Sequence, residues 1–266
     1  MYRFIFILLS VIVFSACRSD KQKGDFSFSE IKIARYDRLQ YEATVQNSFF
    51  SLQRMNTEFA QETRLLVEDV LDLGSVNMLD MNERLCTYFS DSILVHLMED
   101  VGEKFKDVSS IEENLTHGFK NLKKEIRELP VPKIYTQISA LNQSIVVGDS
   151  ILGISLDKYM GDDYPLYKKY YYANQRRSMS PEYIVPDCFT FYLLGQYPFL
   201  WLEGHRSLMD ILLYRGKIAW TVENVLEGDR SGKTALGYTK EEVKWCEQHE
   251  EELWKEMSPL HLRGGA

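Results

Sequence analysis

Residues 133–156 read KIYTQISALNQSIVVGDSILGISL. This stretch decides the fold class, because it holds short runs rich in β-branched residues whereas its surroundings have helical spacing. The runs predict strands over residues 133–139, 144–147 and 151–156, and Gly148-Asp149 is typical of a hairpin turn between the last two. We therefore expect a small antiparallel sheet near residues 133–156.

Helices are predicted on both sides of this stretch, because apolar residues recur every three or four positions. Before the strands, the ranges with this spacing are 55–73, 81–101 and 111–129, with Ser109 and Ser110 at capping-box distance from Glu112 and Glu113. After the strands, helical signals begin at Ser180-Pro181, pass Pro186 in a first turn or kink, continue through residues 207–226, and resume at Thr239 with Glu242 three positions on. Strands and helices are grouped rather than alternating, which predicts an α+β fold: a mostly helical single domain over residues 27–266.

The first 16 residues are interpreted as an export signal. Arg3 supplies a positive charge, and the apolar run over residues 4–14 is too short for the roughly 20 residues that span a bilayer. Ser15-Ala16 place small residues immediately before Cys17, as in the lipoprotein motif whose cysteine thiol receives a diacylglyceryl group. We therefore expect lipid attachment at Cys17, acyl chains such as palmitate that hold the protein on the membrane, and a polar tether over residues 17–26.

Charge and cysteine content exclude several classes of protein. The chain has 31 Lys and Arg against 39 Asp and Glu, a net charge of -8 at pH 7. Nucleic acid is excluded as a partner, because affinity for it depends on neutralising phosphates with Lys and Arg. The cysteines beyond Cys17 are Cys86, Cys188 and Cys246, which lack C-x-x-C spacing and lie in apolar helical contexts, so we expect buried free thiols.

Motifs for catalysis, metal binding and cofactor binding are missing from the sequence. His249-Glu250 resembles the start of a zinc-binding H-E-x-x-H motif, but Leu253 stands where the second His is needed. Residues 228–234 (GDRSGKT) have three residues between the glycines, one fewer than a phosphate-binding loop requires, and G-x-S-x-G is absent. We predict no catalytic residue, no metal site, no cofactor and no enzyme activity.

Residues 164–177 (YPLYKKYYYANQRR) interleave tyrosines with basic side chains and allow two interpretations. The segment could stack sugars or contact an anionic polymer, with candidate contacts at Tyr167, Lys168, Lys169, Arg176 and Arg177. Alternatively, it is an amphipathic helix that turns its tyrosines inward and its basic residues outward. The second interpretation is the commoner outcome for such a pattern.

Five stretches together resemble the gliding-motility lipoprotein GldB family. They are residues 33–37 (IARYD), 152–161 (LGISLDKYMG), 179–185 (MSPEYIV), 215–217 (RGK) and 236–239 (LGYT), the last leading to Trp245-Cys246. The resemblance implies a protein anchored in the cell envelope, with a non-enzymatic structural or assembly role in gliding. Partners implied by it are envelope, motility or secretion-apparatus proteins, and the outer membrane facing the periplasm is the expected location.

The sequence is also similar, more distantly, to predicted zinc peptidases in which H-E-x-x-H stands at the place of residues 196–200 (QYPFL) here. Those side chains cannot bind zinc as peptidase histidines do, and Pro198 would disrupt a helix at that point. This similarity implies a degenerate zincin-like fold. The alternatives that remain open are a cell-envelope hydrolase of the zinc-peptidase type and a glycan-binding module.

The end of the chain departs from the family. Members usually continue into a further helical region after the helix of Trp245, whereas residues 257–266 (MSPLHLRGGA) have no amphipathic pattern. We expect a truncation or frameshift near Glu256, a domain that lacks a C-terminal portion, and an apolar stripe over residues 239–257 without its packing partner.

Overall fold

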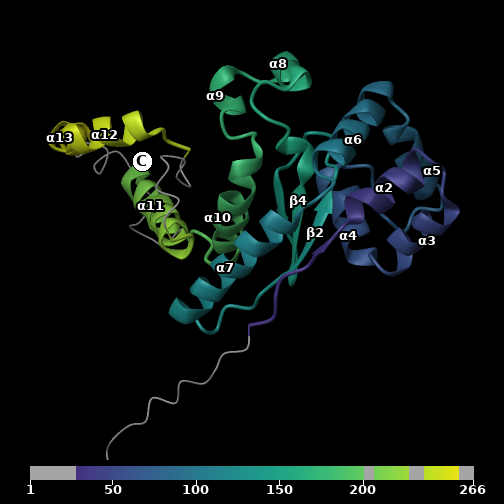
Figure 1. Cartoon of the computed structure of the whole chain (residues 1–266), viewed down its shortest axis with the longest axis horizontal. Coiled ribbons are helices and arrows are strands. Elements are labelled where there is room, and N and C mark those ends of the chain that lie inside the picture. Colours follow the sequence, from purple (N-terminus) through teal and green to yellow (C-terminus); the bar gives the residue numbers. More distant parts are fainter. Residues whose placement is uncertain (1–27, 201–206, 228–236, 258–266) are drawn as a thin grey trace, which may run out of the picture.

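The computed structural model describes residues 28–200, 207–227 and 237–257. Helices surround a small sheet, so the predicted α+β class is confirmed (Figure 1). Cys17, the export signal, the whole tether, the glycine loop at 228–234 and the tail at 258–266 lie outside the described residues. Within the described part of the chain, no helix is both long and apolar enough to cross a membrane.

The described residues form a mixed sheet with the strand order β1-β2-β4-β3. Its strands are β1 (Ile33–Ala34), β2 (Lys133–Gln137), β3 (Ile145–Val147) and β4 (Ile151–Ser155). The antiparallel β3–β4 hairpin is confirmed, but the expectation of a wholly antiparallel sheet is wrong, because β2 pairs with β4 in parallel and β1 pairs with β2 in parallel. The reason is that residues 138–144 lead from β2 to β3, which lies at the edge of the sheet and leaves a space between them. The hairpin then places β4 in that space, antiparallel to β3 and therefore parallel to β2. The two-residue β1 is too short to show a periodic pattern.

Both faces of the sheet are covered, which explains why its strands are continuously apolar. All five residues of β4 are buried, with α10 (Ile184–Gln196) packed on β3 and β4 and α2 (Tyr36–Thr44) packed on β2. At Gly153 the ring of Tyr135 lies directly over the backbone, and a Cβ there would be 2.5 Å from that ring. A glycine in this strand is therefore a packing requirement.

The helices before the sheet are shorter than the sequence predicts. They are α2, α3 (Phe49–Thr57), α4 (Ala60–Arg64), the π-helix η1 (Leu65–Val70), α5 (Met81–Phe89), α6 (Ser92–Lys104) and α7 (Ser109–Glu125). The range 81–101 is broken because Asp91 caps a new helix, accepting hydrogen bonds from the amides of Ile93 and Leu94. The predicted capping box at Ser109 is wrong: α7 already begins at Ser109, and Glu112 instead accepts a hydrogen bond from the Ile33 amide at 2.8 Å.

The helices after the sheet follow the predicted signals more closely. They are η2 (Leu156–Lys158), α8 (Pro165–Tyr170), α9 (Ala173–Arg176), η3 (Pro181–Tyr183), α10, α11 (Leu208–Val225), α12 (Lys240–Gln248) and α13 (Glu250–Met257). Pro186 lies in the first turn of α10, and Thr239 with Glu242 forms the predicted capping box. The last predicted helix is divided at His249, and α12 has no buried residue within the described chain.

Candidate functional site

The two ends of the sheet have different surroundings. The chain enters the described domain at Phe28 and reaches the amino end of β1, whereas the carboxyl ends of β2 and β4 face α8 and α9 (Figure 1). Helix α10 runs against these strands: its first turn lies near Tyr159, just after β4, and its Tyr192 hydroxyl donates to the carbonyl of Pro130, just before β2. The carboxyl ends of parallel strands are a common place for binding sites, so this end of the sheet is the candidate region for a site.

Asp157 is completely buried at that end and holds a turn in place. Its carboxylate accepts hydrogen bonds from the Ser139 amide at 2.9 Å and the Leu141 amide at 2.6 Å, and from the Ser139 hydroxyl at 3.1 Å. Ala140 and Leu141 have positive φ values of 52° and 67°, an uncommon conformation for residues with side chains. Burial raises the pKa of Asp157, while these amides lower it. Asp157 is therefore a structural acceptor.

A polar pocket of about 290 Å³ opens beside the first turn of α10. Asp187 contributes a half-buried carboxylate, whose Oδ2 accepts a hydrogen bond from the Tyr159 hydroxyl at 2.8 Å. Burial raises the pKa of the Asp187 carboxyl to about 6, although the Tyr159 hydrogen bond lowers it. The full set of residues that line the pocket is Asn174, Arg177, Ser178, Tyr183, Asp187, Gly237 and Tyr238. This pocket brings residues 174–187 together with Gly237 and Tyr238, which lie about 50 positions further along the chain.

The tyrosine-rich segment forms two short helices, α8 and α9, instead of one amphipathic helix. Tyr167 is completely buried; its hydroxyl accepts a hydrogen bond from the Met160 amide at 2.9 Å and donates one to the Asp157 carbonyl at 2.5 Å. Its expected role as a surface contact is therefore wrong, because its ring is part of the core. Tyr170 and Tyr172 point outward and are 56% and 80% exposed, so the tyrosines do not share one inward face.

The four basic candidates of this segment do not form one surface. Lys168 and Lys169 are exposed on α8, with the Lys169 ammonium 5.3 Å from the centre of the Tyr170 ring. Arg176 donates to the Asp162 carbonyl at 2.6 Å. Arg177 alone among the five sequence-predicted contacts lines the pocket, and its guanidinium pairs with Glu242 of α12 at 2.8 Å.

Comparison with known proteins places this chain in a family. The model of the family described as gliding motility protein GldB matches residues 19–259, nearly the whole length after the expected lipid site. The chain belongs to the GldB family. The resemblance read from the sequence is confirmed, and membership indicates a gliding-motility lipoprotein of the cell envelope. No curated protein and no solved structure matches the chain, so its similarity to zinc peptidases stays a prediction.

Three of the five GldB-like stretches meet at the Asp187 pocket. Tyr159 comes from residues 152–161, Tyr183 from residues 179–185, and Gly237 and Tyr238 from residues 236–239. Sequence reasoning missed Asp187 itself. A signal was present, since it is the one charged residue in the apolar run 183–194 (YIVPDCFTFYLL), and such a residue needs a partner or a function.

The place that corresponds to the peptidase motif has no zinc-binding chemistry of its own. Helix α10 ends at Gln196, so Pro198 lies beyond the helix rather than breaking it. In the ranges that the structure describes, no group of three His, Cys, Asp or Glu side chains is close enough to hold a metal ion. His249 stacks on Trp245 with ring centres 4.4 Å apart, and the thiols of Cys86, Cys188 and Cys246 are free, that of Cys188 being buried.

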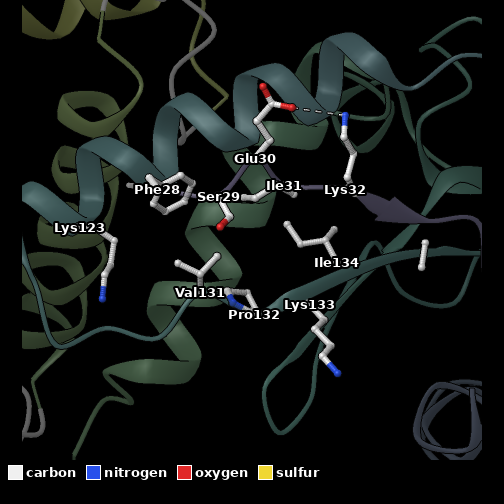
Figure 2. Close-up of a pocket in the computed structure, with 11 residues that line it drawn as sticks. Phe28, Ser29, Glu30, Ile31, Lys32, Lys123, Val131, Pro132, Lys133 and Ile134 are labelled. Carbon is white, nitrogen blue, oxygen red and sulfur yellow. Dashed lines mark ion pairs between the residues drawn. The ribbon is translucent and has the colours of Figure 1, made fainter. Parts of the chain in front are cut away.

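A second cavity, of about 510 Å³, lies where the chain enters the domain, at the opposite end of the sheet (Figure 2). Phe28, Val131 and Pro132 give it an apolar lining, and Lys123 and Lys133 lie at its edge (Figure 2). The Lys32 ammonium pairs with the Glu112 carboxylate at 3.1 Å and with the Glu30 carboxylate at 3.9 Å. The dashed line in Figure 2 marks the pair with Glu30. The Lys123 ammonium donates to the Leu129 carbonyl at 2.8 Å, so its charge is partly used within the fold.

Proposed function

We propose that this GldB family member is a lipid-anchored envelope protein that acts by binding rather than by catalysis. Cys17 carries the lipid, and the folded domain contacts an envelope or motility-apparatus component. The observation that carries the proposal is that the tether and the pocket lie at opposite ends of the sheet. The chain enters at the amino ends of the parallel strands, and the Asp187 pocket opens at their carboxyl ends. An anchored protein built in this way presents its pocket away from the membrane.

The length of the tether supports this orientation. Phe28 lies eleven positions after Cys17, and an extended chain spans at most about 40 Å over that length. The cavity of Figure 2, with Lys123 and Lys133 at its edge, then faces the bilayer at close range. The Asp187 pocket, Lys168 and Lys169 lie toward the other end of the domain and remain accessible to a partner.

The absence of enzyme activity belongs to the same proposal. The residues at the peptidase-motif position, Gln196 to Leu200, offer no imidazole or carboxylate, and the sequence holds no G-x-S-x-G motif. Metal analysis of the purified protein tests this part: we expect less than one-tenth of a zinc ion per chain. Stoichiometric zinc that is lost in a His249→Ala variant would instead favour the zinc-peptidase alternative.

The anchor is tested by growing cells that express the chain with radioactive palmitate. We expect a labelled band for the natural sequence and none for Cys17→Ser, which also leaves the membrane fraction. Protease treatment of intact cells then tests location, since a domain on the periplasmic side of the outer membrane is protected until the cells are permeabilised. A labelled band in Cys17→Ser would contradict lipid attachment at Cys17. Digestion of the domain in intact cells would contradict the periplasmic location and place the domain on the cell surface.

A further inference from the structure

The Asp187 pocket offers both hydrogen-bond donors and acceptors to a ligand. In the part of the chain that the structure describes, Oδ2 of the Asp187 carboxylate has a hydrogen-bond partner and Oδ1 has none. Oδ1 is therefore available as an acceptor. Arg177 and Asn174 bring N–H donors to the wall, and the Ser178 hydroxyl can donate or accept. A ligand that fits this lining carries several groups that both donate and accept, as alcohol hydroxyls do.

The charges of the pocket disfavour a small ion. The guanidinium of Arg177, which is half-exposed at the edge, is already paired with Glu242 at 2.8 Å, and the carboxylate of Asp187 already accepts a hydrogen bond from the Tyr159 hydroxyl at 2.8 Å. Neither charge therefore needs a counter-ion from the ligand, and a ligand with a single charge would meet one like charge in the lining as well as one opposite charge. An uncharged polar ligand meets no like charge.

The aromatic residues and the size of the pocket further narrow the class of ligand that it can bind. Tyr183 and Tyr238 both line the pocket; Tyr183 is buried, whereas Tyr238 is 45% exposed and offers its ring to a ligand. Such rings pack against the C–H face of a ligand while their hydroxyls remain hydrogen-bonded. The volume of about 290 Å³ is at the small end of ligand pockets, which run from about 300 to 1,000 Å³, and suits one ring rather than an oligomer.

We propose that the Asp187 pocket binds one uncharged sugar ring of an envelope glycan. Asp187 and Asn174 hydrogen-bond the ring hydroxyls, Tyr238 covers one ring face, and Arg177 closes the edge. This inference rests on the proposed function for the location of the protein, because only an exported domain meets such a glycan. It differs from the contact surface expected from the sequence, of which Arg177 alone is retained.

Saturation-transfer NMR on the detergent-solubilised full-length protein tests the proposal. The probes are the methyl glycosides of glucose, galactose, mannose and N-acetylglucosamine, with butylammonium and acetate as charged comparisons. We expect transfer to at least one glycoside and to neither ion. Tyr238→Ala and Asp187→Asn should weaken that binding at least tenfold, because one removes the ring face and the other removes the carboxylate acceptor.

Tyr170→Ala is the matched control, since Tyr170 is similarly exposed but lies outside the pocket. It should bind the glycoside as the natural sequence does. If Asp187→Asn fails to fold, as judged by thermal melting, the exposed Tyr238→Ala carries the test. No transfer to any glycoside, equal binding by the pocket variants, or transfer to an ion would overturn the proposal. Palmitate labelling at Cys17 is independent of these results and reports on the proposed function separately.

Discussion

Two aspartates at the carboxyl end of the sheet have different roles: one fixes the conformation of a turn, and the other lines a pocket. Asp157 uses its carboxylate to satisfy two backbone amides in a turn with positive φ, and it has no room for a ligand. Asp187, 30 residues later, is held by one hydrogen bond from Tyr159 and faces a pocket. Two partly or wholly buried carboxylates thus differ in role because the first is fully hydrogen-bonded and the second is not.

Gly153 gives a first prediction about packing. In Gly153→Ala the new Cβ would lie 2.5 Å from the Tyr135 ring, and overpacking of this kind lowers the free energy of unfolding by about 1–3 kcal/mol. Urea denaturation followed by circular dichroism measures the change. Gly102→Ala is the control, because nothing lies within 4 Å of that position in α6, and alanine there is expected to be neutral or to stabilise by up to about 1 kcal/mol. Equal effects in both variants would contradict the packing argument.

Asp187 gives a second prediction, on pH dependence. Its pKa is raised from 3.8 to about 6 in the folded protein, so folding favours the protonated carboxyl. The stability it contributes is fully present below about pH 4 and is lost as pH rises through about 6. Relative to the natural sequence, Asp187→Asn should therefore gain about 1–3 kcal/mol of unfolding free energy between pH 4 and pH 7.5.

Denaturant titrations at several pH values measure this gain. Asp149→Asn is the control, because Asp149 is exposed in the hairpin turn and its substitution should shift stability by a constant amount. If the stability difference between Asp187→Asn and the natural sequence does not change with pH, the Asp187 carboxyl has its ordinary pKa in the folded protein and the prediction is wrong.

At the scale of elements, α12 and α13 are the least supported parts of the described fold. No residue of α12 is buried, and the half-exposed Arg177–Glu242 ion pair joins it to the tyrosine-rich segment. The indoles of Trp245 and Trp254 are about half exposed. An exposed ion pair contributes only about 0–1 kcal/mol. These helices therefore depend on weak contacts, and so does the position of Tyr238 at the start of α12.

Breaking this ion pair gives a third prediction. In Arg177→Ala, α12 loses its contact with the segment after α9, so trypsin should cut at Lys240 and Lys244 several-fold faster, while the melting temperature of the remaining domain stays nearly constant. Timed digestion with mass spectrometry measures both sites. Arg84→Ala removes an ion pair with Asp80 elsewhere on the surface and should leave these cuts unchanged. Equal digestion of Arg177→Ala and the natural sequence would show that other contacts hold α12.

At the scale of the whole molecule, the strand directions set the orientation relative to an anchored tether. Lys133 lies at the amino end of β2, whereas Lys168 and Lys169 lie on α8 at the other end, and all three side chains are exposed. This arrangement makes the two ends chemically distinguishable by their lysines.

A fourth prediction follows for the lipid-anchored protein in vesicles. Acylation of Lys133 by an amine-reactive reagent should slow several-fold compared with the protein in detergent, because the bilayer covers that end, whereas Lys168 and Lys169 should react at the same rate in both. Peptide mass spectrometry measures the rates. Uniform slowing of all three lysines, or none at Lys133, would contradict the proposed orientation.

The sequence by itself determined the family, the α+β class, the β3–β4 hairpin and the capped start of α12. These depend on local spacing, turn residues and caps, which neighbouring residues decide. Only the tertiary structure decided that β2 and β4 run in parallel, that Tyr167 belongs to the core, and that Asp187 faces Arg177 and Tyr238 across a pocket. Each of these depends on contacts between residues distant in the chain, and burial of apolar surface selects such contacts without leaving a periodic mark on the sequence.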